Sequence, residues 1–300
     1  MAKKHTSESR PTRGSGSLRP PGFGRRGRSR AAPPREPVAV AVAADAADFA
    51  GLGRHGLFGE ADYPSYLRRT EGRLRAMYGQ GLDVHLRVLE PADFEEFCEE
   101  HLLDPADPVA RVAYAADPEL AGEPFRYTGQ RLAELLPALL ADHLARVRIS
   151  IGCAALLAAV GWEDRPEERL AAVLGYVSEV CLALAAGAGE GCHGVTLRSV
   201  GPADGEELAA STDLCVVSGE LPGGGRGLEA LCVTLAAAVA GCGSGELLLR
   251  TDGRVRGWAL VDGWLRPMSA AETEAVLAAV PAAERGSAVA RAGFPLRVGE

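Results

Sequence analysis

The chain has 300 residues, which suits two domains of ordinary size or one domain with a tail. Hydrophobic residues make up 47% and charged residues 24%, as in soluble globular proteins, and no run of 18 uncharged apolar residues occurs, so a membrane span is not expected. Residues 1–36 carry ten Lys or Arg and two Glu, a balance of +8, whereas the other 264 carry 22 basic and 38 acidic side chains, a balance of −16. An acidic body of this kind repels a nucleic-acid duplex, which leaves only the basic arm as a nucleic-acid contact.

The choice of residue types indicates a GC-rich bacterial genome, because Ala, Gly, Arg and Pro dominate and lysine occurs only as Lys3 and Lys4. Seven cysteines include no CxxC pair and lie mostly in apolar runs, where a free thiol behaves as a small hydrophobic group. One segment could serve export, with paired arginines before VAVAVAA, but its apolar part is short and is interrupted by Asp45 and Asp48. The sequence therefore predicts reduced thiols and a cytoplasmic location.

The first ordered elements are expected after a long tail. Residues 1–55 are rich in Pro, Gly, Ser, Arg and Ala without a sustained period, which predicts disorder. Order should begin near Tyr63, where the helix PSYLRRTEGRLRAMY starts with a proline in its first turn. Residues 82–88 alternate between apolar and polar types and predict a half-buried strand. The segments ADFEEFCEEHLL and PVARVAYAA predict two further helices.

The stretch YLRRTEGRLRAMYGQGLDVHLRVLEPADFEEFCEEHLLDP, followed by RYTGQRLAELLPALL, resembles a group of uncharacterised actinobacterial proteins. The resemblance covers about residues 60–160 and rests on the order of helix, strand, Glu-Pro and acidic helix. That group has no known activity, so the resemblance implies no functional residue. The C-terminal third of the chain adds nothing to it.

Residues 137–184 form the longest apolar-periodic stretch and predict a helical hairpin, with arms through LLADHLARVRISIGCAALLAAV and EERLAAVLGYVSEVCLALAA and a turn at GWEDRP. Because Pro137 cannot donate a helix-interior hydrogen bond, the first arm is expected to kink or restart there. One face of the first arm is expected to carry His143, Val147, Ile151, Ala154 and Leu157. Steps of four and three residues in the second arm predict a seam for an antiparallel neighbour, made of Leu170, Leu174, Val177, Cys181 and Leu184.

After residue 190 the pattern changes from helical to alternating. The segments VTLRSV and DLCVVS predict strands, and LEALCVTLAAAV predicts a buried helix. Apolar runs on both sides of Asp252-Gly253 predict a β-hairpin. Ser269 and Glu272 have the spacing of a capping box at the start of the helix AAETEAVLAAV. The last twenty residues are expected to be loosely ordered, with room for one edge strand.

These elements together predict an α+β fold. The helical hairpin is expected to lie between a small helix-and-strand unit and a small α+β unit that contains the β-hairpin. The corresponding domains are a disordered basic and Ala-rich tail over residues 1–55, a mainly helical domain over 56–190, and an α+β domain packed on the hairpin over 191–300.

Motifs for cofactors and metals are sparse. Gly189, Gly191 and Gly194 match G-x-G-x-x-G, but they follow a helix and precede a strand, which is the reverse of the dinucleotide fingerprint. The turn LPGGGRGLEAL opens a helix and places Arg226 beside free N–H groups, so Arg226 is the candidate for an anionic cofactor. A plain flexible loop explains the same turn, and no cofactor is expected.

The metal candidates lie on one acidic helix. Glu96, Glu99 and His101 bring carboxylates and an imidazole to nearby positions, where a divalent ion would need a further ligand from elsewhere. A solvated acidic helix face explains the same residues without any ion, so no metal is expected.

The candidates for proton transfer are a polar row and one isolated histidine. Asp83, His85 and Arg87 alternate along the predicted strand 82–88 and therefore project from one face, where His85 could act between an acid and a base. A solvated strand face explains them equally well. His143 lies on the apolar face of the hairpin, which favours a histidine that is satisfied within the core over a catalytic base.

Three functions remain open. The favoured hypothesis is a non-catalytic cytoplasmic binding or adaptor protein with a protein partner or a second copy, because apolar faces are many and convergent polar groups are few. The alternatives are an enzyme that uses Asp83, His85 and Arg87, and a weak, salt-sensitive association of residues 1–36 with nucleic acid.

Overall fold

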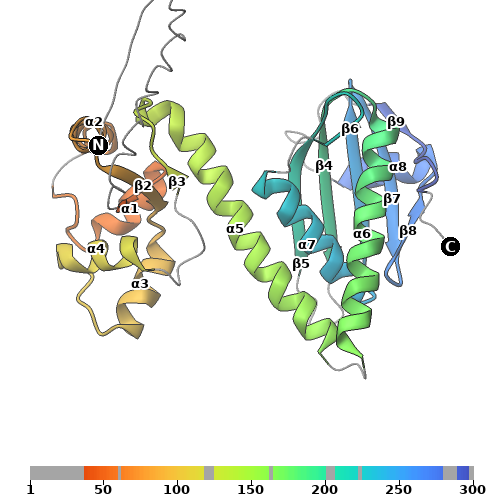
Figure 1. Cartoon of the computed structure of the whole chain (residues 1–300), viewed down its shortest axis with the longest axis horizontal. Helices are drawn as coiled ribbons and strands as arrows, with labels where there is room; N and C mark the ends of the chain where they lie inside the picture. The colour runs from red at the N-terminus through yellow and green to blue at the C-terminus, as the bar shows by residue number, and fades with distance from the viewer. Residues whose placement is uncertain are drawn as a thin grey trace, which may run out of the picture. The chain divides into compact units, whose positions relative to one another are not determined.

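A computed structural model describes residues 37–59, 62–117, 125–161, 165–200, 207–221, 225–279 and 289–296. It confirms the predicted α+β class, with a small N-terminal sheet and its helices, two long helices, and a larger C-terminal sheet (Figure 1). The basic arm over residues 1–36 lies outside the described residues.

The N-terminal sheet has three strands in the order β1-β2-β3. Strand β1 (Pro37–Val42) pairs in parallel with β2 (Asp83–Val88), and β3 (Phe125–Arg126) pairs antiparallel with β2. Four helices accompany these strands: α1 (Ala46–Gly53), α2 (Tyr63–Gly79), α3 (Pro91–Glu100) and α4 (Pro108–Ala116). The parallel pair matters for function, because the connections that leave the carboxyl ends of β1 and β2 meet at one edge of the sheet.

The predicted tail over residues 1–55 is too long. Residues 37–53 contain β1 and α1, and Asp45 caps α1 by accepting a hydrogen bond from the Asp48 backbone N–H at 2.8 Å. The segment PVAVAV is nearly continuous in apolar residues, as is typical of a parallel strand that needs a partner to become ordered. That partner is β2, more than 40 residues later in the chain, so the local pattern gave no sign of it.

Helix α5 (Leu132–Val160) is a single helix that runs through Pro137 and does not restart there. Pro137 is the sixth residue of the helix, so its missing N–H removes one interior hydrogen bond, and its side chain is exposed. The predicted face of this helix is wrong in its second half, because Ile151 is 45% exposed and Leu157 is 63% exposed. The buried side instead carries small residues such as Ala145 and Gly152, and a Cβ on Gly152 would lie 2.8 Å from Val233 Cγ1.

The helix after the turn, α6 (Pro166–Ala188), does not use α5 as its main neighbour. Helix α5 packs against α7 (Arg226–Ala240), and α6 packs against α7 and the C-terminal sheet (Figure 1). The predicted seam is therefore partly wrong: Val177, Cys181 and Leu184 are buried, but Leu174 is 43% exposed. Periodicity identified α6 as a helix with a buried face. Because α7, and not α5, is its main helical neighbour, the residues on that face differ from those predicted.

The C-terminal sheet has the order β5-β4-β6-β7-β8, and β9 pairs in parallel with β7. Its strands are β4 (Gly191–Val200), β5 (Glu207–Val216), β6 (Ser244–Thr251), β7 (Arg254–Val261), β8 (Trp264–Pro267) and β9 (Val289–Arg291). Helices α6 and α7 cover one face, whereas α8 (Ala270–Ala279) covers part of the other. Alternation along β6 produces this division, because Leu247 and Leu249 pack towards α6 and α7 while Leu248 packs towards α8.

The predicted β-hairpin at Asp252-Gly253 is confirmed between β6 and β7. Both turn residues have positive φ, 43° for Asp252 and 72° for Gly253, as a tight two-residue hairpin turn requires. A second hairpin between β7 and β8 uses the same Asp-Gly pair at Asp262-Gly263, with φ of 49° and 81°. The sequence analysis missed this second turn, although its signal is identical.

Two hydrophobic clusters form the cores. The N-terminal cluster is made of buried residues between Ala41 and Leu139, and the C-terminal cluster of buried residues between Leu156 and Trp258. The two clusters share no member, and α5 contributes Leu132, Leu135 and Leu139 to the first and Leu156 and Val160 to the second. The predicted domain boundary near residue 190 stays a prediction, since residues 36–300 form one compact unit by contacts.

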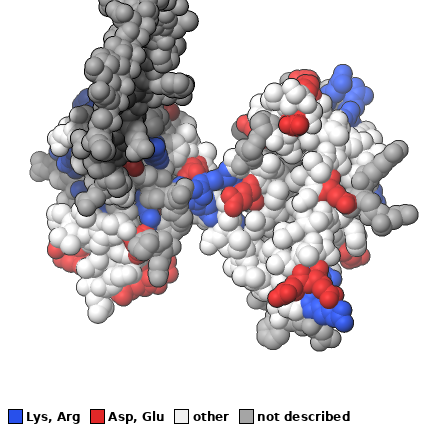
Figure 2. All heavy atoms as spheres, in the orientation of Figure 1, with Lys and Arg blue, Asp and Glu red and all other residues white. Residues whose placement is uncertain are grey.

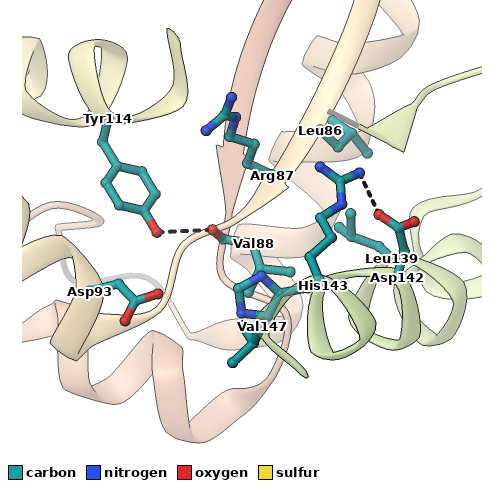
Figure 3. Close-up of a pocket in the computed structure, with 10 residues that line it drawn as sticks. Leu86, Arg87, Val88, Asp93, Tyr114, Leu139, Asp142, His143 and Val147 are labelled. Atoms are coloured by element: carbon teal, nitrogen blue, oxygen red, sulfur yellow. Dashed lines mark hydrogen bonds and ion pairs between the residues drawn. The ribbon is translucent and has the colours of Figure 1, made fainter. Parts of the chain in front are cut away.

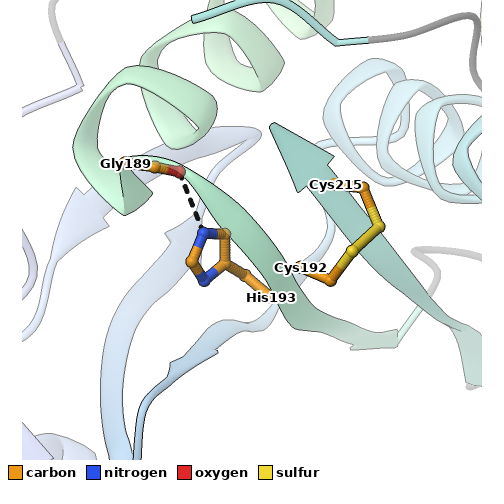
Figure 4. Close-up of a disulfide and its surroundings, with 4 residues drawn as sticks. All are labelled: Gly189, Cys192, His193 and Cys215. Carbon is orange, nitrogen blue, oxygen red and sulfur yellow. Dashed lines mark hydrogen bonds between the residues drawn. A yellow bond between two sulfur atoms is a disulfide. The ribbon is translucent and has the colours of Figure 1, made fainter. Parts of the chain in front are cut away.

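A disulfide joins β4 and β5 (Figure 4). Cys192 and Cys215 are paired in the antiparallel register with their Cα atoms 4.0 Å apart, and their sulfur atoms are bonded. The expectation of reduced thiols is wrong for this pair, because only the strand register brings together two cysteines that are 23 residues apart. The cytoplasmic location stays a prediction.

The capping box at the start of α8 is confirmed. The Ser269 backbone N–H donates to Glu272 Oε2 at 2.7 Å, and the Glu272 backbone N–H donates to Ser269 Oγ at 3.2 Å. Arg266 also binds this carboxylate, through Nη2 and Oε1 at 2.8 Å. The hydrogen bond from Arg266, followed by those from Ser269, lowers the pKa of Glu272 to about 2.

We expect Glu272→Gln to lose stability at neutral pH and to differ less from the wild type in acid. A carboxyl with a lowered pKa in the folded state stabilises the fold above its unfolded pKa, and this contribution is lost as pH falls towards the folded pKa of about 2. Urea unfolding at about pH 7 and about pH 3 measures both differences. An equal difference at the two pH values would contradict this assignment.

Candidate functional site

The predicted polar row lies on one face of β2, and its members divide into two groups. Asp83 binds His85 through Oδ2 and Nε2 at 3.4 Å and binds Arg126 of β3 through Oδ1 and Nε at 3.0 Å. Desolvation acts to raise the pKa of Asp83, but the hydrogen bonds and charges of His85 and Arg126 outweigh it and hold that pKa below its usual value. Asp83 and His85 thus belong to an ion-paired group at the start of the strand.

Arg87, two residues further along β2, lines a cavity of about 70 Å³ (Figure 3). Residues of β2, α3, α4 and α5 surround this cavity, among them Asp93, Tyr114, Asp142, His143 and Arg146. Burial, followed by the charge of Arg146, lowers the pKa of Arg87 from its usual value. The Tyr114 hydroxyl donates to the Val88 carbonyl at 3.4 Å, which fixes α4 against the end of β2.

His143 lies at this cavity; it is mostly buried and has a hydrogen-bond partner, but that partner is a carboxylate beside the cavity and not a group within the apolar core. Its side chain is 15% exposed, and its Nε2 lies 3.3 Å from Oε2 of Glu90. Figure 3 shows the imidazole on the side of the cavity that also holds Asp93. Glu90, Asp93 and His143 each offer one metal-ligating atom, and these atoms all lie within 4.8 Å of one another. This set is named the Glu-Asp-His cluster below.

Local sequence explains why the two carboxylates gather there. Glu90 lies two residues after the end of β2 and is the N-cap residue of α3, Pro91 begins the helix, and Asp93 lies in its first turn. The β1–α1 connection adds Asp45 and Asp48 at the same edge of the sheet, since β1 and β2 are parallel. Sequence reasoning missed Glu90 and Asp93 because their position at a shared sheet edge becomes clear only once β1 is known to pair in parallel with β2.

The cluster has an excess of negative charge. Desolvation, followed by the charges of Asp45 and Glu90, raises the pKa of Asp48. Desolvation, followed by the charge of Glu90, also raises the pKa of Asp93. In both cases His143 acts in the opposite direction. The arrangement therefore favours a positive charge near His143.

The rim of the cavity on α5 connects to the helix that Arg226 begins. Asp142 binds Arg146 one turn later at 2.5 Å and binds Arg226 Nε through Oδ1 at 3.0 Å. Arg226 is the first residue of α7, as its position after the Gly-rich turn predicted, but its guanidinium binds a carboxylate of the chain itself. The glycines 222–224 lie outside the described residues.

The predicted metal residues on α3 do not converge. Glu96 and Glu99 are exposed, and His101 stacks on Phe97 with its Nδ1 3.0 Å from the Phe97 carbonyl oxygen. Within the described ranges, the set of His, Cys, Asp and Glu side chains that comes together is the Glu-Asp-His cluster.

The long helices expose much apolar surface. Both α5 and α6 are long and apolar enough to cross a membrane by length and composition, and only 22% and 33% of their most apolar windows are buried. Figure 2 shows that most of the surface around α6 is uncharged, with separate acidic and basic groups scattered over it. The exposed large residues on these helices are Leu144, Ile151, Leu157, Leu174 and Leu182.

Comparison with known proteins identifies one domain. Residues 26–130 match the domain of unknown function DUF8829, which overlaps the stretch that resembles uncharacterised proteins. The match includes β1, β2 and the carboxylates of the Glu-Asp-His cluster, and ends before His143. No curated protein and no solved structure matches the chain.

Proposed function

We propose that this chain is a binding protein that associates with a second copy of itself through the outer face of α5. The observation that carries the proposal is an apolar stripe that no described segment buries. Ile151 and Leu157 are 45% and 63% exposed, and no charged residue occurs between Arg148 and Gly161. Exposed apolar patches on a soluble chain mark interaction surfaces.

The spacing of the stripe favours a helical partner. Its central row advances by three, four, three and four positions: Leu144, Val147, Ile151, Ala154 and Ala158. Leu157 lies beside this row, three residues after Ala154. This step pattern is the seam of a left-handed helix pair, in which small residues let the backbones approach closely. The stripe lies opposite the side of α5 that packs on α7, so α5 can hold both neighbours at once. In a two-fold dimer, the stripe of one chain is buried against the same stripe of the other, because such an interface is self-complementary.

We expect Ile151→Glu combined with Leu157→Glu to convert a dimer to a monomer. Two buried carboxylates without partners cost several kcal/mol at an interface of this kind. Sedimentation velocity on the full chain measures the change, and far-UV circular dichroism checks the fold. Val109→Glu with Val112→Glu is the matched control, since these valines are 62% and 64% exposed on α4.

A monomeric wild type contradicts self-association. If that monomer floats with anionic vesicles and the double variant does not, the apolar helices serve a membrane surface instead, in line with their length and composition. Association of the basic arm with nucleic acid stays a prediction, because residues 1–36 lie outside the described residues.

A further inference from the structure

The Glu-Asp-His cluster has the chemistry of a transition-metal site. One imidazole nitrogen and two carboxylate oxygens form a ligand set that zinc accepts, whereas magnesium prefers oxygen alone. Two ligands of a tetrahedral zinc ion lie about 3.4 Å apart, given bonds of about 2.1 Å. The separation of 3.3 Å between His143 Nε2 and Glu90 Oε2 is close to this spacing, and all three ligand atoms lie within 4.8 Å of one another.

The ligands come from two elements that the fold holds firmly. Glu90 and Asp93 are fixed at the junction of β2 and α3, where Phe94 is fully buried in the N-terminal cluster. His143 stands four residues after Leu139, which α5 buries in the same cluster. A site built on rigid elements needs little rearrangement to bind an ion.

The surroundings meet two further needs of a metal site. Asp45, Asp48, Glu90 and Asp93 bring four carboxylates to the carboxyl ends of the parallel strands β1 and β2, and this negative charge favours a bound cation. The adjoining cavity of about 70 Å³ is lined by Asp93 and His143 and has room for water. A zinc ion with three protein ligands keeps a fourth position for such a water.

We infer that Glu90, Asp93 and His143 bind one zinc ion, with its open coordination position towards the cavity that Arg87 and Tyr114 line. This inference goes beyond the proposed association, although His143 and the stripe residue Val147 lie on the same helix and both line the cavity. The site places a Lewis acid next to a cationic side chain, an arrangement that fits an anionic ligand on the metal.

Zinc titration by calorimetry tests the inference on the full-length wild type. We expect one ion per chain and no comparable binding of magnesium. His143→Gln and Asp93→Asn are each expected to weaken zinc binding by about 100-fold or more, since the loss of an outer-sphere partner alone costs about 10- to 100-fold. The matched control is His55→Gln, which removes an imidazole that pairs with Glu95 at 2.9 Å outside the cluster and leaves affinity unchanged.

Cobalt distinguishes this site from the free cysteines of the chain, such as Cys153 and Cys242. Cobalt bound by nitrogen and oxygen gives visible d–d bands without the near-ultraviolet thiolate charge-transfer band. Absence of stoichiometric zinc binding, retained affinity in His143→Gln, or a thiolate band for the bound cobalt would each overturn the assignment.

Discussion

Trp258→Ala is expected to reduce the free energy of unfolding by about 3–5 kcal/mol, the usual cost of emptying a large aromatic site in a core. Trp258 is fully buried in the C-terminal cluster, on the sheet face that α6 and α7 cover. Its indole N–H donates to the Phe294 carbonyl at 2.9 Å, and the two rings meet edge to face with centroids 4.9 Å apart. The variant therefore loses a packed ring and leaves the Phe294 carbonyl without its donor.

Urea unfolding followed by far-UV circular dichroism measures this loss. Trp264→Ala is the matched control, because Trp264 is 65% exposed and packs only one side on Tyr176, so we expect a change of about 1 kcal/mol or less. A similar loss in both variants would show that Trp258 is not the centre of this core.

Phe94→Ala is expected to cost the N-terminal cluster about 3–5 kcal/mol as well. Phe94 is fully buried and meets Tyr114 edge to face at 5.6 Å, which ties α3 to α4. Since a domain is stable by only about 5–15 kcal/mol, this loss removes a large share of the stability of that part. Phe94→Leu keeps most of the volume and should cost less than half as much.

The same variant tests whether the two clusters unfold separately. All three tryptophans, Trp162, Trp258 and Trp264, follow residue 160, so their fluorescence reports the C-terminal part alone. Because the clusters share no member, we expect Phe94→Ala to shift the circular dichroism transition to lower urea and to leave the fluorescence midpoint unchanged. An equal shift of both signals would mean that α5 couples them into one cooperative unit.

Elements whose signal is local were predictable from the sequence. Strand β2 alternates, the Asp252-Gly253 pair encodes a tight turn, and Ser269 with Glu272 encodes a cap, so each could be placed without knowledge of its neighbours. Helix α5 was recognised from its apolar period, but the restart predicted at Pro137 does not occur.

The faces of the long helices could not be predicted, because periodicity gives several apolar rows without saying which one meets a neighbour. On α5 the buried row is the one with Ala145 and Gly152, since close contact with α7 leaves no room for larger side chains. The larger residues Ile151 and Leu157 remain outside. We assign the binding surface to this row because it is the more hydrophobic of the two and is exposed.

The candidate site was partly visible. Arg87 was singled out on β2 and does line the cavity, but His85 pairs with Asp83 away from it. His143 was assigned to the core because it falls on an apolar face of the predicted hairpin, and its partner Glu90 is 53 residues away. No local pattern connects residues that far apart.

The sequence by itself determined the α+β class, the basic arm on an acidic body, and most helices and turns, because propensity, charge and turn chemistry act over a few residues. Only the tertiary structure decided that β1 orders beside β2, that Cys192 meets Cys215, and that His143 joins Glu90 and Asp93. Each of these depends on contacts between segments distant in the chain, which form when burial in a shared core offsets the entropy of closing the loops between them.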